Sequence, residues 1–72
     1  DSNNVTVMEN LGVAISMTGN FKLALSYFKK ALLFEPEKVQ LHMNLYLTYR
    51  NLGKLNKAKY HFSLYRKFKK EK

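Results

Sequence analysis

The feature that most restricts the fold of this chain is an internal repeat with a period of 34 residues. At that shift, positions of matching size and polarity align along both halves of the chain. They are Val5 with Val39, Leu11 with Leu45, Gly19 with Gly53, Ala24 with Ala58, Phe28 with Phe62 and Phe34 with Phe68. A period of this length indicates stacked copies of one small unit, because a single copy cannot bury its own apolar face. The sequence therefore predicts two copies of one supersecondary unit.

The apolar spacing within each copy predicts a pair of helices. In the first copy, apolar residues recur at intervals of three and four and so share one helical face: Val5, Met8, Leu11 and Ile15. This pattern predicts a first helix that follows the polar residues 1–4 and ends near Thr18. Gly19 is expected to take the left-handed conformation that closes a helix, and Asn20 to cap the next one.

The remaining three helices follow from similar signals. The second helix is apolar on more than one side, which predicts that it is covered on more than one side. It should end before Pro36, because a residue that precedes proline is pushed out of the helical region. A third helix is expected from Glu37 to Leu52, and a fourth from about Asn56 into the basic tail.

With this period and pattern, the chain resembles the tetratricopeptide repeat (TPR) family. In the first copy the family's Leu, Gly, Ala, Phe and Pro positions are occupied by Leu11, Gly12, Ala24, Phe28 and Pro36. The second copy is degenerate: Tyr46 stands at the tight-packing glycine, which predicts wider local spacing or an aromatic ring at an exposed edge.

The resemblance implies an all-α fold of two TPR helix-turn-helix hairpins, four antiparallel helices in a right-handed α-solenoid stack. It implies one domain over residues 1–72, with a first repeat at 5–38 and a degenerate end repeat at 39–72 that closes with a basic helix.

Composition excludes several kinds of site. The chain of 72 residues has no cysteine, so neither disulfides nor thiolate metal sites are available. We found no phosphate-binding loop, and we interpret His42 and His61 as packing or surface residues, not ligands. We therefore expect no catalysis, no metal and no cofactor. Neither a signal peptide nor a membrane-spanning run is present, which favours a cytoplasmic protein or a piece of a longer chain.

Charge is distributed unevenly between the two copies. The net charge of the chain is +8. The net charge of residues 1–36 is zero, because this half has three lysines and three acidic residues. Residues 37–72 carry ten Lys and Arg against Glu37 and Glu71. This asymmetry predicts that the second copy attracts acidic groups.

The resemblance places the first helix of each repeat on a concave side where extended peptides bind. Asn10 and Asn44 occupy equivalent positions and would bind a peptide backbone, while Met17 and Met43 would form an adaptable apolar floor. The alternative is a solvated helix face. A carboxylate-binding clamp is disfavoured, because Glu9 and Val13 stand where its Lys and Asn belong. The predicted peptide-binding residues are Glu9, Asn10, Val13, Met17, Gln40, Met43, Asn44, Leu47 and Arg50.

The last helix is the second candidate surface, because basic and aromatic residues alternate along it. We predict an interaction patch that consists of Tyr60, Leu64, Tyr65, Arg66, Lys67, Phe68 and Lys69. The alternative is an end helix with a solvated basic face. Occupants of the patch would be a further helix of a longer chain, a second copy or an acidic partner. Nucleic acid and anionic membranes rank below these.

Taken together, the sequence predicts a non-catalytic scaffold that binds a peptide or protein segment through the concave face or the aromatic-basic end helix. The alternative is a self-association module, since two repeats are fewer than the roughly three that such folds need for stability. Binding of an anionic surface is the third hypothesis.

Overall fold

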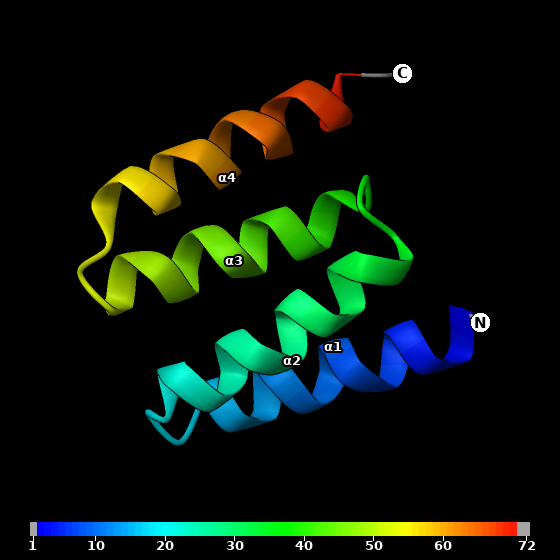
Figure 1. The fold of residues 1–72 in the computed structure, drawn as a ribbon, viewed down its shortest axis with the longest axis vertical. Helices are drawn as coiled ribbons and strands as arrows, with labels where there is room; N and C mark the ends of the chain where they lie inside the picture. The colour runs from blue at the N-terminus through cyan, green and yellow to red at the C-terminus, as the bar shows by residue number, and fades with distance from the viewer. Residues whose placement is uncertain (1, 71–72) are drawn as a thin grey trace.

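The computed structural model describes residues 2–70, with side chains from Asn4 onward, and shows four α-helices. These are α1 (Ser2–Ser16), α2 (Phe21–Phe34), α3 (Val39–Asn51) and α4 (Leu55–Lys69). The helices form two antiparallel hairpins, α1 with α2 and α3 with α4, and α2 also packs on α3 (Figure 1). The predicted all-α architecture of four pairwise-packed helices is thereby confirmed.

The turns within the two hairpins match the sequence prediction. Gly19 and Gly53 both have positive φ, at 91° and 76°, as the left-handed helix end requires. The backbone N–H of Leu23 donates to the Asn20 side-chain oxygen at 3.3 Å, so Asn20 does cap α2. Equivalent glycines therefore close α1 and α3.

Several predicted helix boundaries need correction. The helix α1 begins at Ser2, because the polar residues before Val5 accept helical geometry without an apolar face, and it ends at Ser16 instead of Thr18. The helix α3 begins at Val39 instead of Glu37, since Lys38 has extended backbone angles. The helix α4 begins one residue earlier than predicted, at Leu55. Asp1, which the sequence placed before the first helix, lies outside the described residues.

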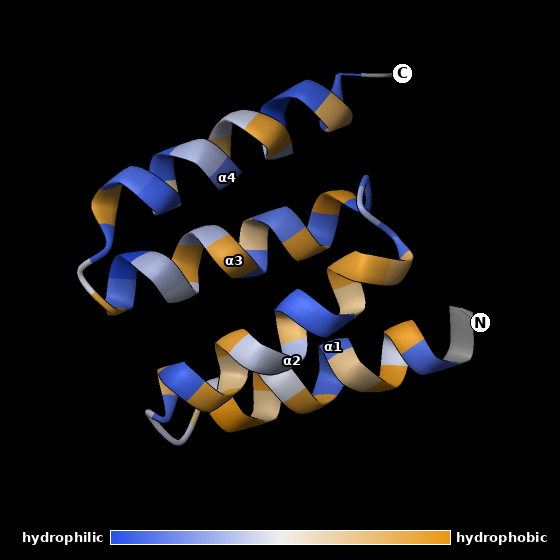
Figure 2. Cartoon of the chain, viewed as in Figure 1, coloured by the Kyte–Doolittle hydropathy of each residue, from blue (hydrophilic) through white to orange (hydrophobic). Residues whose placement is uncertain are grey.

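The core lies mainly in the two central helices. The buried apolar residues are Val5, Ala24, Phe28, Ala31, Leu41, Leu45, Tyr49 and Ala58. The helix α2 is covered by both α1 and α3, as its wide apolar surface predicted. The helix α4 is the most hydrophilic of the four in Figure 2. Apolar burial is therefore greatest in α2 and α3, while Val5 of α1 and Ala58 of α4 complete the core.

Leu11, which lies on the apolar face predicted for the first helix, is not buried. Leu11 is 43% exposed, whereas its repeat equivalent Leu45 is fully buried. The reason is position: α3 lies between α2 and α4, while α1 packs chiefly on α2 alone. Glu9 and Gly12 are buried on α1 instead.

The small residue at position 12 is needed for close packing. A Cβ atom added to Gly12 would lie 2.5 Å from the Phe28 ring, a distance that no real contact allows. In the second hairpin Tyr46 takes the place of that glycine, and its ring centroid lies 4.9 Å from that of Phe62. Tyr46 is half-buried and Phe62 is 36% exposed, so the ring that lies nearer the surface is that of Phe62.

Candidate functional site

A groove runs between α1 and α3, the two helices predicted to line a concave face. Its hollow measures about 320 Å³ and is lined by Val13, Ser16, Met17, Phe21, Phe28, Asn44, Leu47, Thr48 and Asn51. The fold thus brings four of the predicted binding residues, Val13, Met17, Asn44 and Leu47, to one surface. Phe28 reaches this groove from α2.

The apolar part of the groove is accessible. Val13 is 38% exposed, Met17 82% and Leu47 36%. Thr48 and Asn51 border these side chains with polar groups, although the Asn51 amide nitrogen donates to the Leu47 carbonyl at 2.9 Å. Met43 is half-buried and does not line the hollow, so Leu47 occupies the place expected for it.

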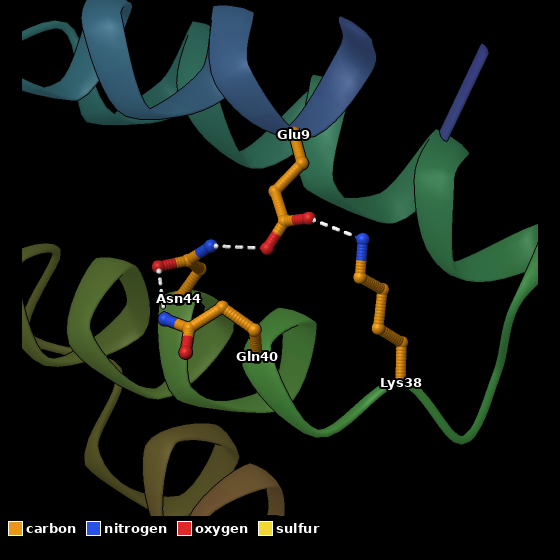
Figure 3. Close-up of polar contacts among 4 residues, drawn as sticks. All are labelled: Glu9, Lys38, Gln40 and Asn44. Carbon is orange, nitrogen blue, oxygen red and sulfur yellow. Dashed lines mark hydrogen bonds and ion pairs between the residues drawn. The ribbon is translucent and has the colours of Figure 1, made fainter. Parts of the chain in front are cut away.

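A buried carboxylate lies beside this groove and joins α1 to α3 (Figure 3). The Lys38 ammonium donates to one Glu9 oxygen at 2.7 Å, and the Asn44 amide donates to the other at 3.2 Å. Gln40 in turn donates to the Asn44 oxygen at 3.5 Å. Glu9 is only 8% exposed, so the centre of this network is buried, while Gln40 at its end is exposed. The sequence did not reveal it, because Lys38 is 29 residues away and lies in a turn.

The other predicted groove residues lie outside the hollow. Asn10 is exposed on α1. Arg50 is also exposed, and its guanidinium donates to the Tyr46 hydroxyl at 3.2 Å and lies 5.3 Å from the centre of that ring. Asn10, Arg50 and Gln40 do not line the hollow. Peptide binding by these three residues stays a prediction.

A second hollow lies on the outer face of α4. It measures about 460 Å³ and is lined by Phe62, Tyr65, Arg66, Lys69 and Lys70. Tyr65, Arg66 and Lys69 belong to the patch predicted from the sequence. Phe62 and Lys70 were missed, since Phe62 matches a packing position of the first repeat.

The other residues of the predicted patch do not line this hollow. The Phe68 ring centroid lies 5.4 Å from that of His42, so Phe68 packs toward α3. Lys67 is exposed, with its ammonium 5.7 Å from the centre of the Phe68 ring. Leu64 is half-buried, whereas Tyr60 is 60% exposed.

The two histidines, separated by 19 residues, form a buried pair between α3 and α4. Their Nδ1 atoms are 3.0 Å apart, and His42 Nε2 lies 2.7 Å from the Pro36 carbonyl oxygen. Because a carbonyl only accepts, His42 Nε2 must donate, which leaves His42 Nδ1 to accept from the Nδ1–H of His61. Both side chains are buried, so they belong to the packing between α3 and α4.

Burial and the neighbouring His42 lower the pKa of His61 to about 4. Among residues 2–70 no group of three or more potential metal ligands comes together.

A third hollow, of about 410 Å³, opens between α2 and the second hairpin. Its lining residues are Lys29, Leu32, Leu33, Pro36, Leu45, Tyr49 and His61. No residue in it was predicted as a site.

Comparison with known proteins gives two similar sequences. The chain is 36% identical over 58 residues to human (Homo sapiens) protein O-mannosyl-transferase TMTC3, and 34% identical over 64 residues to the mouse (Mus musculus) protein of that name. These matches cover 81% and 89% of this chain but only 6% and 7% of the relatives. The chain therefore spans a small fraction of the length of the curated relatives it matches.

No family model matches the chain, and no solved structure matches it. None of the helices described between residues 2 and 70 has the length and hydrophobicity that crossing a bilayer requires. The cytoplasmic location expected from the sequence stays a prediction. The chain is thus similar, over most of its own length, to a short stretch of a much larger protein in two mammals.

Proposed function

We propose that this chain is a pair of TPR hairpins, stacked as a right-handed α-solenoid, that acts as a non-catalytic scaffold. It binds an extended segment of another protein in the groove between α1 and α3. The transferase activity in the name of the relatives is a property of those whole proteins. In a chain of that kind, the matched stretch would provide a protein-binding module.

The repeat period supports the first part of this proposal. The helices α2 and α4 occupy equivalent positions at the 34-residue shift, and so do the glycines that end α1 and α3. Two hairpins with the same turns and the same register are what a tandem helical repeat requires. The similarity to TMTC3, which covers most of the chain, lies in this helical region.

The observation that best supports binding is the accessible apolar lining of the groove. Val13, Met17 and Leu47 present apolar surface that a bound segment would bury, and the polar side chains of Asn44 and Asn51 border it. The Glu9–Lys38 pair lies beside this surface and fixes the position of α1 relative to α3. A groove held in one shape binds with a smaller ordering cost.

Substitution at Met17 tests this assignment. Peptides selected against the wild-type chain from a random display library should bind Met17→Asp about tenfold more weakly. Leu33→Asp is the matched control, because Leu33 is also 82% exposed but lies outside the groove. If the selected peptides bind both variants equally well, the groove is not the binding site.

Self-association is the second candidate function. The outer face of α1 exposes Val7 at 56% and Leu11 at 43%, which is apolar surface that a second copy would cover. Sedimentation at increasing protein concentration should then show a rising mass. A chain that stays monomeric at the highest concentration rules this candidate out.

A further inference from the structure

The outer face of α4 is the repeat equivalent of the face of α2 that receives α3. The five residues that line the α4 hollow lie 34 positions after Phe28, Ala31, Leu32, Glu35 and Pro36. On α2, Phe28 is 2% exposed and Ala31 is fully buried. On α4, Phe62 is 36% exposed and Tyr65 half-exposed. Tyr46 of α3 contacts one side of Phe62, and no other helix within residues 2–70 packs on α4. The α4 face therefore has the position of a helix-receiving surface but is open.

The chemistry of that surface differs from its equivalent in the first repeat. Leu32, Glu35 and Pro36 are replaced by Arg66, Lys69 and Lys70, and Ala31 by Tyr65. No acidic residue occurs from position 54 to position 70, while seven basic residues do: Lys54, Lys57, Lys59, Arg66, Lys67, Lys69 and Lys70. The ion pair within residues 2–70 is that of Lys38 with Glu9, so it uses none of these seven. The charge of this face is complementary to an acidic partner.

The aromatic rings on this face argue against nucleic acid as that partner. Proteins that bind single strands stack bases on accessible aromatic faces. Here the Tyr65 ring stacks on Phe62 at 5.8 Å between centroids, and the Lys69 ammonium lies 5.1 Å from the centre of the Tyr65 ring. Phe62 also packs on Tyr46. Because the rings are engaged with one another and with Lys69, they offer an apolar contact surface but few open faces for bases.

A second copy of the chain does not supply the required charge. The chain has five acidic residues and a net charge of +8, so two copies repel each other. Glu9 is buried and already paired with Lys38. Glu35 and Glu37, at the turn between α2 and α3, are the other acidic residues that the structure describes.

We propose that the outer face of α4 binds an acidic, amphipathic helical segment of a partner protein. An apolar side chain of that segment packs against Phe62 and Tyr65, and its carboxylates pair with Arg66, Lys69 and Lys70. This surface is separate from the groove between α1 and α3, so it does not depend on the function proposed for the groove.

A synthetic helix provides the test. The probe is a fluorescein-labelled peptide of about 18 residues, long enough to form a helix alone, with leucine on one face and glutamate on the other. Its affinity for the whole chain is measured by fluorescence anisotropy. Arg66→Glu with Lys69→Glu should weaken binding at least tenfold, and the neutral pair Arg66→Gln with Lys69→Gln by a smaller factor. Circular dichroism checks that each variant keeps its helices.

The matched control is Lys22→Glu with Lys30→Glu, which makes the same charge change at two exposed positions of α2. This pair should weaken binding less than threefold. Equal losses in the two charge-reversed pairs would overturn the proposal, because binding would then follow net charge alone. The proposal is also overturned if the peptide does not bind, or if a peptide with glutamine in place of glutamate binds equally well.

Two further probes separate the other occupants. A single-stranded oligothymidylate and vesicles that contain an anionic lipid are titrated under the same conditions. If either probe binds more tightly than the acidic peptide, and Arg66→Glu with Lys69→Glu abolishes that binding, the partner of this face would be nucleic acid or a membrane and not an acidic segment. A wild-type dimer in sedimentation that the same double variant abolishes would replace it by a second copy.

Discussion

The two hairpins share one helical register but fill the space between their helices in different ways. In the first, Gly12 leaves room for the Phe28 ring to lie directly on the backbone of α1, and Phe28 is 2% exposed. In the second, Tyr46 occupies that room. The equivalent Phe62 is 36% exposed, lies tilted against the Tyr46 ring and stacks on Tyr65. The phenylalanine opposite Gly12 is therefore a core residue, and the equivalent phenylalanine opposite Tyr46 is a surface residue.

The difference shows how one repeat frame supports two kinds of surface. The first hairpin buries its ring and depends on close backbone approach. The second exposes its ring beside Arg66 and Lys69, where it lines a hollow. Polar residues follow the same division, since His42 and His61 stand where the first hairpin has Met8 and Tyr27. Of the residues that differ in the second repeat, the two histidines are therefore buried, while Arg66 and Lys69 are exposed and available for recognition.

The largest expected effect comes from placing leucine at the two equivalent positions 12 and 46. Gly12→Leu should lower the free energy of unfolding by about 3 kcal/mol, because its side chain would overlap the Phe28 ring. Tyr46→Leu should cost only about 1 kcal/mol, the value of the lost aromatic contact with Phe62. Urea denaturation followed by circular dichroism measures both values. Similar losses would show that the two sites are packed alike.

The second expected effect is a dependence of stability on pH that arises in the second hairpin. The pKa of His61 is about 4 in the folded chain, against an ordinary value of 6.5. As the pH falls below about 6.5, the unfolded chain therefore binds the proton first, and folding loses stability until the pH approaches about 4. The titratable and charged groups near His61 are His42 of α3, which contacts it, and Lys29 of α2, which lines the hollow between α2 and the second hairpin together with His61. Between about pH 7 and pH 5 the loss should be on the order of 1–2 kcal/mol.

The control for the pH effect replaces the two histidines of the second hairpin by the residues at the equivalent positions of the first hairpin. The double variant His42→Met with His61→Tyr removes both imidazoles, so its melting temperature should change less over this pH range. The wild-type chain should lose several degrees, at roughly 4–8 °C per kcal/mol for a domain of this size. An equal pH dependence in both proteins would assign the effect to the carboxylates instead.

The third expected effect concerns the buried carboxylate of the first hairpin. Lys38→Met should cost about 1–2 kcal/mol, because it leaves Glu9 buried with Asn44 as its remaining partner. Glu9→Met introduces the residue found at the equivalent position 43 and should cost less than about 1 kcal/mol, since Lys38 is 30% exposed and can be hydrated. Thermal unfolding of the two variants gives the order. The opposite order would mean that the ion pair does not hold α1 to α3.

These effects also show which parts of the molecule were predictable from sequence. The four helices and their turns follow from short-range signals, such as apolar spacing, Gly19, Asn20 and Pro36, and all of them appear in the structure. Leu11 was placed in the core incorrectly, because its spacing fits a buried face and the pattern does not show how many helices cover α1.

The contacts of the candidate sites were harder to predict, since they depend on side chains far apart in the sequence. Glu9 meets Lys38 across 29 residues, and His42 meets His61 across 19. Repeat register identifies equivalent positions but not what lies opposite each one. Phe62 was therefore assigned to packing by analogy with Phe28, and Tyr46 shows why the analogy fails at that position.

The smallest expected difference lies at the turns, where the two hairpins are alike. Gly19 and Gly53 have φ angles of 91° and 76°, and a Cβ atom at either position would meet nothing within 4 Å. Each glycine-to-alanine change should therefore cost only the strain of the left-handed backbone, about 1–2 kcal/mol, and the two costs should agree within about 0.5 kcal/mol. Urea denaturation of the two single variants measures both. A clearly larger cost at one turn would mean that the hairpins differ in their backbone as well as in their side chains.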